Sequence, residues 1–410
     1  MTTRRQSSLR RSSQRRSSLR RGPLRAWLAA TGCTVLLSGT SCFIDLDVGS
    51  RLDARALDVP ARDSPIDILF VVDNSGSMAE EQAALARTLM RDECPIHDLA
   101  NVPAGLIDPG PDMLEELAGL CGLAQILASL QRDFRIGVIT TDVNACDNVL
   151  GAPLDREQQF RPQRGCLQPV PGTGDKVLTP DTPNLAEAFV TLVTGVGTHG
   201  TAVERGLDAA AIFLVGDSWV SPGCEGDRAA FLRPEAELLL IFVTDEDDCS
   251  NDGSTAAFTH ATSTICGQDP DVLLSNQPNL CYERADELTP VARYADVLRN
   301  LKGEGRDAWV RVGVIGGVVG EGERQRANGC IDIDGVVENE CFESGGNSNF
   351  TQSGQLCDPA IRDREVCCSA DGARRYLRLR TALAPGRFEA ATICQEGFIS
   401  SLIDMALPPG

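Results

Sequence analysis

The sequence predicts an α/β fold with a doubly wound, mostly parallel β-sheet and long insertions held by disulfides. Four runs rich in β-branched residues stand at 67–72, 135–140, 238–243 and 309–319, and helical patterns lie between them. Strands that alternate with helices form a mostly parallel sheet with helices on both faces. The runs are apolar almost throughout, which is typical of strands covered on both faces.

The helical patterns are segments in which apolar residues recur every three to four positions. They occupy 79–90, 113–130, 185–193, 201–214, 288–302 and 396–407. We expect the folded domain to span residues 65–407. The order of the strands in the sheet does not follow from these patterns and stays open.

Residues 1–41 are predicted to be an export signal. The first 25 residues contain nine arginines and no acid, the segment 26–37 is apolar, and small residues lead to Cys42. This order of basic, apolar and small residues is typical of export signals. The alternative is a short buried helix with a basic arm that binds nucleic acid.

A lipid on Cys42 would anchor the exported chain to a membrane. Gly39 stands where bacterial lipoprotein signals usually have leucine, and Cys33 is a competing site with a shorter apolar run before it. Residues 42–64 are polar, acidic and without a sustained period, which predicts a tether.

The charge of the chain excludes nucleic acid as the expected partner. The sequence has 58 acidic and 38 basic residues, and removal of the nine N-terminal arginines leaves 29 basic residues. Such an acidic body repels phosphate and attracts cations.

Cysteines and histidines limit the chemistry further. The sixteen cysteines do not form paired CxxC motifs, so disulfides in an oxidising compartment are expected. Pairs close in sequence are expected, such as Cys94 with Cys121 and Cys146 with Cys166. The three histidines are far apart in sequence, which disfavours a histidine-rich metal site or a Ser/His/Asp hydrolase.

Oxygen-bearing side chains follow two of the predicted strands. Asp73, Ser75 and Ser77 alternate directly after the first strand, and Asp245 follows the third. Ligands of an open α/β sheet bind off the carboxyl ends of its strands. Carboxylates and hydroxyls are hard ligands that suit Mg²⁺, Mn²⁺ or Ca²⁺. The alternative is that Asp73 and Ser75 only cap the following helix.

Together with the segment GTHGTAVERGLDAA, these motifs resemble the von Willebrand factor A family. The resemblance implies a Rossmann-like fold with a metal-ion-dependent adhesion site. The matching ligands are Asp73, Ser75, Ser77, Thr201 and Asp245. Thr201 matches better than Thr198, because Gly200 and Leu207 keep the family's spacing around it. The resemblance further implies a divalent cation, Mg²⁺ first and Mn²⁺ or Ca²⁺ otherwise, that binds an Asp or Glu carboxylate of a partner protein.

The segments VTDEDDCS, LTPVARYADVLRNLK and ICQEGFISSLIDM resemble a cysteine-rich branch of that family in bacteria, made of secreted proteins and lipoproteins. This resemblance implies a non-enzymatic binding module that is exported to the cell envelope, on the outer membrane or cell surface, or is secreted. Two alternatives remain. One is a metal-dependent hydrolase that uses the acidic cluster 245–248, and the other is a structural envelope protein with a vestigial metal site.

Two further acidic segments are weaker candidates for cation sites. Asp248, Ser250, Asp252 and Gly253 follow the start of a calcium-loop pattern, but Thr259 stands where the pattern has glutamate. We therefore expect a solvated acidic loop there. The segment 332–335 is expected to be a tight turn.

Overall fold

The structure is a computed structural model, and the residues that it describes all lie in the unit Ala54–Gly410 of the chain. The predicted export segment, Cys42, most of the tether and Thr201 lie outside the described residues. Cys146, the segment 252–284 and the predicted turn 332–335 lie outside them as well. The described residues are 60–61, 63–107, 110–143, 165–198, 200, 204–216, 224–251, 285–318, 348–351, 367–370, 372–393 and 398–407.

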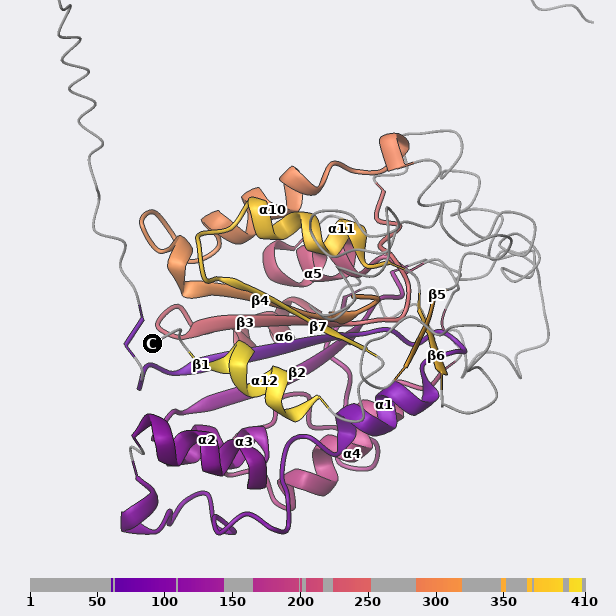
Figure 1. Ribbon diagram of the computed structural model, residues 1–410. Coiled ribbons are helices and arrows are strands. Elements are labelled where there is room, and N and C mark those ends of the chain that lie inside the picture. The colour runs from indigo at the N-terminus through magenta and orange to yellow at the C-terminus, as the bar shows by residue number, and fades with distance from the viewer. Residues whose placement is uncertain are drawn as a thin grey trace, which may run out of the picture. The chain divides into compact units, whose positions relative to one another are not determined.

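Five parallel strands form the central sheet, in the order β2-β1-β3-β4-β7 (Figure 1). They are β1 (Ile66–Val72), β2 (Phe134–Thr140), β3 (Glu237–Val243), β4 (Val310–Gly316) and β7 (Phe388–Thr392). The predicted α/β class and parallel sheet are confirmed, and the first four strands begin within one residue of the predicted runs. A separate antiparallel pair is formed by β5 (Ser348–Thr351) and β6 (Cys367–Ala370).

Strand β7 was not predicted because its sequence, FEAAT, contains no apolar run. It is an edge strand that pairs only with β4 in the sheet. Phe388 is buried, whereas the next two residues are exposed. An edge strand needs less apolar character than a central one, so periodicity alone does not find it.

The side chains of β1 alternate between the two faces of the sheet. Ile66, Ile68, Phe70 and Val72 belong to one hydrophobic cluster, and Leu69 and Val71 belong to the other. This alternation follows from the two-residue period of a strand. All seven residues of β1 are buried, as predicted for a strand covered on both faces.

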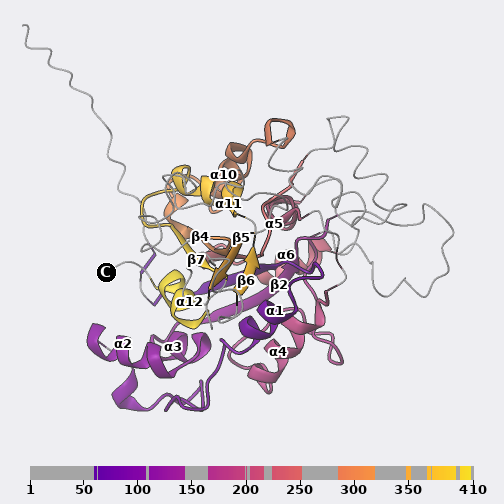
Figure 2. The same ribbon diagram turned by 45° about the vertical axis from the view of Figure 1, so that its right-hand side comes forward.

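Helices cover both faces of the sheet (Figures 1 and 2). Residues of α1 (Ala79–Ala86), α3 (Leu123–Ser129), α4 (Leu185–Gly195) and α12 (Ile399–Ala406) join the first cluster. Residues of α5 (Gly206–Val215), α6 (Cys224–Phe231), α10 (Val291–Asn300) and α11 (Arg374–Leu377) join the second. In the part of the chain that is described, no helix combines the length and apolar character needed to cross a membrane.

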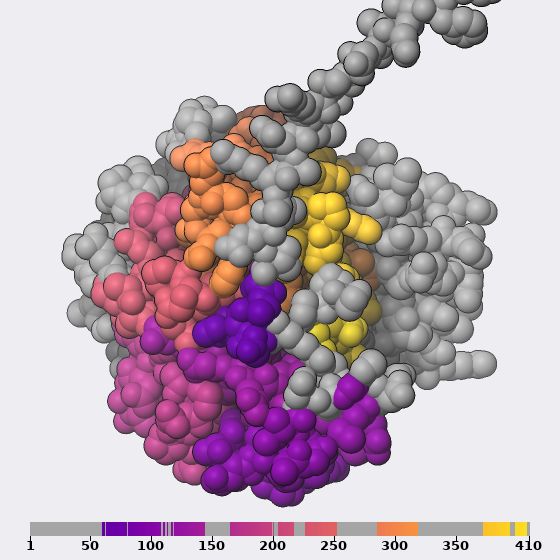
Figure 3. All heavy atoms as spheres, turned by 90° about the vertical axis from the view of Figure 1, so that its left-hand side faces the viewer, coloured from indigo at the N-terminus to yellow at the C-terminus, as the bar shows by residue number. Residues whose placement is uncertain are grey.

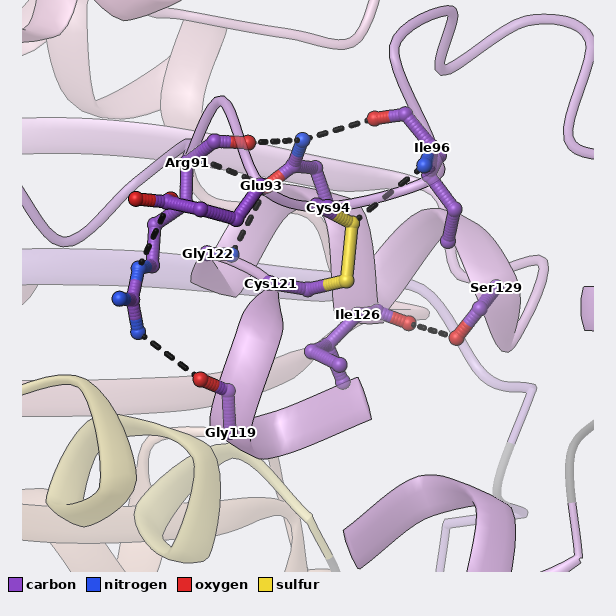
Figure 4. Close-up of a disulfide and its surroundings, with 10 residues drawn as sticks. Arg91, Glu93, Cys94, Ile96, Gly119, Cys121, Gly122, Ile126 and Ser129 are labelled. Atoms are coloured by element: carbon purple, nitrogen blue, oxygen red, sulfur yellow. Dashed lines mark hydrogen bonds and ion pairs between the residues drawn. A yellow bond between two sulfur atoms is a disulfide. The ribbon is translucent and has the colours of Figure 1, made fainter. Parts of the chain in front are cut away.

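The predicted helix at 113–130 is in fact two helices, α2 (Pro111–Leu120) and α3. Cys121 between them is extended and forms a disulfide with Cys94, which confirms that predicted pair (Figure 4). At Gly122 the chain passes close to the backbone of Leu89. A Cβ at this position would lie 2.3 Å from the Leu89 carbonyl oxygen, so only glycine fits. Short 3-10 helices complete the described elements: η1 (Ala104–Leu106), η3 (Ala285–Glu287), η4 (Asp307–Trp309) and η6 (Arg378–Thr381).

A buried ion cluster closes the amino end of the sheet, the side of the molecule that faces the viewer in Figure 3. Glu237, the first residue of β3, accepts hydrogen bonds from three arginines: Arg132 at 2.9 Å, Arg311 at 2.6 and 2.8 Å, and Arg387 at 3.2 Å. Arg132 and Arg311 also donate to carbonyl oxygens at the end of α12. This amino-end cluster thus ties the last helix to the sheet.

Candidate metal site

The strand order reverses between β1 and β3, because the chain passes from β1 to β2 on one side and then to β3 on the other. In parallel sheets the crevice off the carboxyl ends at such a point is the usual place for a ligand. Asp73 directly follows β1, and Asp245 is the second residue after β3. The structure therefore places both predicted carboxylates at the switch point of the sheet.

Asp73 is completely buried and firmly held. Its backbone N–H donates to the carbonyl of Val243 at 2.9 Å, which extends the pairing of β1 with β3. Its Oδ1 accepts the N–H of Ser75 and its Oδ2 accepts the hydroxyl of Thr244, both at 2.7 Å. Burial raises the pKa of Asp73, and these two hydrogen bonds oppose that rise.

Ser75 and Ser77 lie side by side, with their hydroxyl oxygens 3.1 Å apart. Ser75 is buried and Ser77 is exposed, so the pair runs from the buried end of the sheet to the surface. Helix α1 begins after Met78 and has no side-chain cap hydrogen bond. The alternative in which Asp73 and Ser75 only cap this helix is therefore wrong.

Asp245 lies against Asp73 and Ser77. Burial and the charge of Asp73 raise the pKa of Asp245 well above its ordinary value, and a hydrogen bond with Ser77 opposes the rise. Its Oδ1 has no hydrogen-bond partner among the described residues. A buried carboxylate oxygen in that position costs free energy unless something binds it.

Thr201 lies outside the described residues, but its neighbour Gly200 is positioned at the site. The Gly200 N–H donates to the carbonyl of Asn74 at 2.7 Å. A Cβ at Gly200 would lie 2.5 Å from Asn74 Oδ1, so the two residues are in close contact. The segment that leads into Thr201 is thus attached to the loop that carries Asp73, Ser75 and Ser77.

Two residues that hold this loop were not predicted. Gln82 of α1 donates through Nε2 to the carbonyl oxygens of Asp73 and Gly197, each at 2.9 Å. Glu204, just before α5, is buried next to Asp73. Burial and the charges of Asp73 and Glu246 raise the pKa of Glu204 well above its ordinary value. A glutamate three positions after Thr201 was the only sequence signal for it.

The expectation of a solvated acidic loop at 248–253 is wrong for the residues described. Asp248 and Ser250 are fully buried. Asp248 forms an ion pair with Arg375 at 3.0 Å and accepts the N–H of Leu207 in the first turn of α5 at 3.0 Å. Ser250 accepts the N–H of Asp208 at 2.8 Å. The described part of this loop caps α5, and Asp248 already has an arginine and backbone N–H groups as partners.

The site has the composition expected of a hard-cation site. Asp73, Glu204 and Asp245 form no ion pair with a described lysine or arginine. Within the described ranges no three Asp, Glu, His or Cys side chains converge to hold a metal ion by themselves. The predicted set does not require such a group, since it combines two carboxylates with three hydroxyls. The unpartnered oxygen of Asp245 beside Ser77 fits a cation in this place.

Comparisons with known proteins do not identify the chain: no family model matches it, and no curated protein matches it.

Proposed function

We propose that this chain is an exported binding module similar to the von Willebrand factor A family, and that it uses a divalent cation to bind a partner protein. The supporting observation is the pair Asp73 and Asp245 at the switch point of a parallel sheet, with one buried carboxylate oxygen that has no partner among the described residues. Buried carboxylates are usually paired with a base or bound to a metal ion, and acids with strongly perturbed pKa values cluster at functional sites.

Asp73, Ser75, Ser77, Thr201 and Asp245 would hold the cation. The firm hydrogen bonding of Asp73 orients its carboxylate, and the adjacent hydroxyls of Ser75 and Ser77 offer neutral oxygens. Two carboxylates leave a divalent cation able to attract one more anion. A cation in this place would supply a positive charge that binds an Asp or Glu carboxylate of the partner. Among the divalent cations, Mg²⁺ best suits a site with few carboxylate ligands.

The remaining parts of the proposal concern location. We propose that residues 1–41 direct export and that a lipid on Cys42, followed by a tether, holds the module at the cell envelope. Several disulfides support an oxidising compartment, because Cys94 and Cys121 are paired and Cys166 and Cys249 also lie in disulfides.

The structure gives less support to a hydrolase that uses the acidic cluster 245–248. Asp248 is neutralised by Arg375, and Asp247 accepts the N–H groups of Arg375 and Asp248. Asp247 and Asp248 are therefore already engaged in structural contacts. A vestigial site remains the alternative that the next experiment excludes or supports.

Calorimetry with Mg²⁺ and Mn²⁺ tests the site. Asp73→Ala should abolish cation binding, because it removes the central carboxylate. Ser77→Ala should weaken binding less, because water can partly replace an exposed neutral hydroxyl. Glu187→Gln on α4 removes one exposed acid and serves as a control of equal charge change. Equal cation affinity in wild type, Asp73→Ala and Ser77→Ala would remove the basis of the proposal.

The same variants test partner binding. Capture of envelope proteins by the wild-type chain should require Mg²⁺ and should be lost on addition of a chelator. Asp73→Ala should capture none of the metal-dependent partners, whereas Glu187→Gln should capture all of them. Capture that is identical with and without chelator would contradict a metal-dependent adhesion function.

A further inference from the structure

The backbone of Glu204 is held between the two strands that flank β1. The N–H of Arg205 donates to the carbonyl of Thr141, next to the end of β2, at 3.2 Å. The carbonyl of Glu204 accepts the N–H of Cys249, in the loop after β3, at 2.7 Å. These two bonds fix Glu204 across the carboxyl end of the sheet, where Asp73 lies.

The side chain of Glu204 is buried at the candidate metal site and only partly satisfied there. It is 1% exposed. Its carboxyl group interacts with the carboxylate of Asp73 and with the hydroxyl of Thr141, but its Oε1 has no partner at hydrogen-bonding distance among the described residues. The structure describes no lysine or arginine paired with it. A carboxyl oxygen in such a position is costly unless a cation or an ordered water binds it.

Asp73 is the common neighbour of Glu204 and Asp245. Each of these two carboxyl groups is close enough to be affected by the charge of Asp73. Each also has one buried oxygen without a described partner. The unsatisfied oxygens therefore occur on two residues that both lie next to the central carboxylate of the site.

We propose that Glu204 is a third acidic residue of the cation site and accepts a hydrogen bond from a water molecule bound to the cation. This inference rests on the proposed function. Direct coordination by all three carboxylates is not what the geometry favours, because they do not converge on one point. Hydrated Mg²⁺ keeps several waters, and such waters are strong donors to a buried carboxylate.

The consequence is a site that binds its cation without help from a partner. Asp73 and Asp245 supply two negative charges, and Glu204 would supply a third once cation binding releases the proton that it shares with Asp73. Residues that act on a metal through its bound water typically change metal affinity by about 10- to 100-fold when they are replaced. Glu204 would thus set the cation affinity of the free chain.

The test is calorimetric titration of the full exported chain with Mn²⁺ alone, in the absence of any partner. Glu204→Gln keeps the size of the side chain and removes its charge, Glu204→Asp keeps the charge, and Glu187→Gln is the matched surface control. Asp245→Asn reports on the proposed site itself. The melting temperature of each variant in chelator shows whether the fold is kept.

We expect Glu204→Gln to weaken Mn²⁺ binding by about 10-fold or more, with Glu204→Asp intermediate and Glu187→Gln unchanged. If Glu204→Gln binds within about twofold of wild type while Asp245→Asn loses binding, the role of Glu204 is overturned and the proposed function stands. If wild type itself does not bind Mn²⁺, both fail. If Glu204→Gln does not fold, Glu204→Asp is the deciding variant. An Mn²⁺ affinity of Glu204→Asp equal to that of wild type would then overturn the inference.

Discussion

Buried carboxylates stand at both ends of the sheet, but their surroundings differ. At the amino end, Glu237 is surrounded by three arginines, and Asp67 is paired with Arg233 at 2.8 Å. At the carboxyl end, Asp73, Glu204 and Asp245 have no ion pair with a described lysine or arginine. A buried charge is tolerated when a counter-charge and hydrogen bonds satisfy it. We therefore interpret the amino end as structural and the carboxyl end as a place for a cation.

The end of the sheet at which a buried acid lies does not by itself show whether the acid is structural or available to a cation. Asp248 lies only three residues after Asp245, yet it is paired with Arg375 and holds the first turn of α5. The carboxylate of Asp248 is structural although it lies near the candidate metal site. The presence or absence of a basic partner, rather than location, separates the two classes of buried acid.

The largest expected effect is on stability at the amino end. Glu237→Gln should lower the free energy of unfolding by about 3–5 kcal/mol, because it leaves buried arginines without their counter-charge. Urea denaturation in chelator measures this, with Glu187→Gln as control.

Asp245→Asn at the other end should change the free energy of unfolding by less than about 1 kcal/mol in chelator, because it leaves no buried base unpaired. If the two variants destabilise the chain equally, the two ends of the sheet do not differ in the way we describe.

A smaller effect is expected from pH. Burial raises the pKa of Asp247 from 3.8 to about 7, and it also raises those of Glu204 and Asp245. Between about pH 4 and pH 7 these carboxyl groups lose their protons in the unfolded chain but keep them in the folded chain. The free energy of unfolding in chelator should therefore fall as pH rises from about 4 to about 7.

Urea denaturation across this pH range measures the fall, and Asp247→Asn should flatten part of it. Stability that increases steadily over the same interval would show that the acids at the carboxyl end are stabilised in their charged form.

Features that depend on local pattern were predicted from the sequence, and features that depend on distant contacts were not. The apolar runs that correspond to β1 and β3 predicted that Asp73 and Asp245 follow the carboxyl ends of two strands. The break between α2 and α3 depends on the approach of Gly122 to Leu89, which no helical pattern reveals.

The same limit applied to the acids of the site. Asp248 and Glu204 have similar sequence surroundings, in that each is an acid in a polar segment near a predicted ligand. Only the packing of Arg375 from a segment 127 residues away distinguishes them. The sequence therefore predicted carboxylates after two of the strands, but not which further acids remain available to a cation.

The most direct test of the central claim is to locate Mn²⁺ in crystals of the chain by its anomalous scattering. We predict one strong peak at the switch point, next to the carboxylate of Asp73 and the hydroxyls of Ser75 and Ser77, and its loss in Asp73→Ala. A peak at Asp248 instead, or no peak near Asp73 at saturating Mn²⁺, would contradict the account.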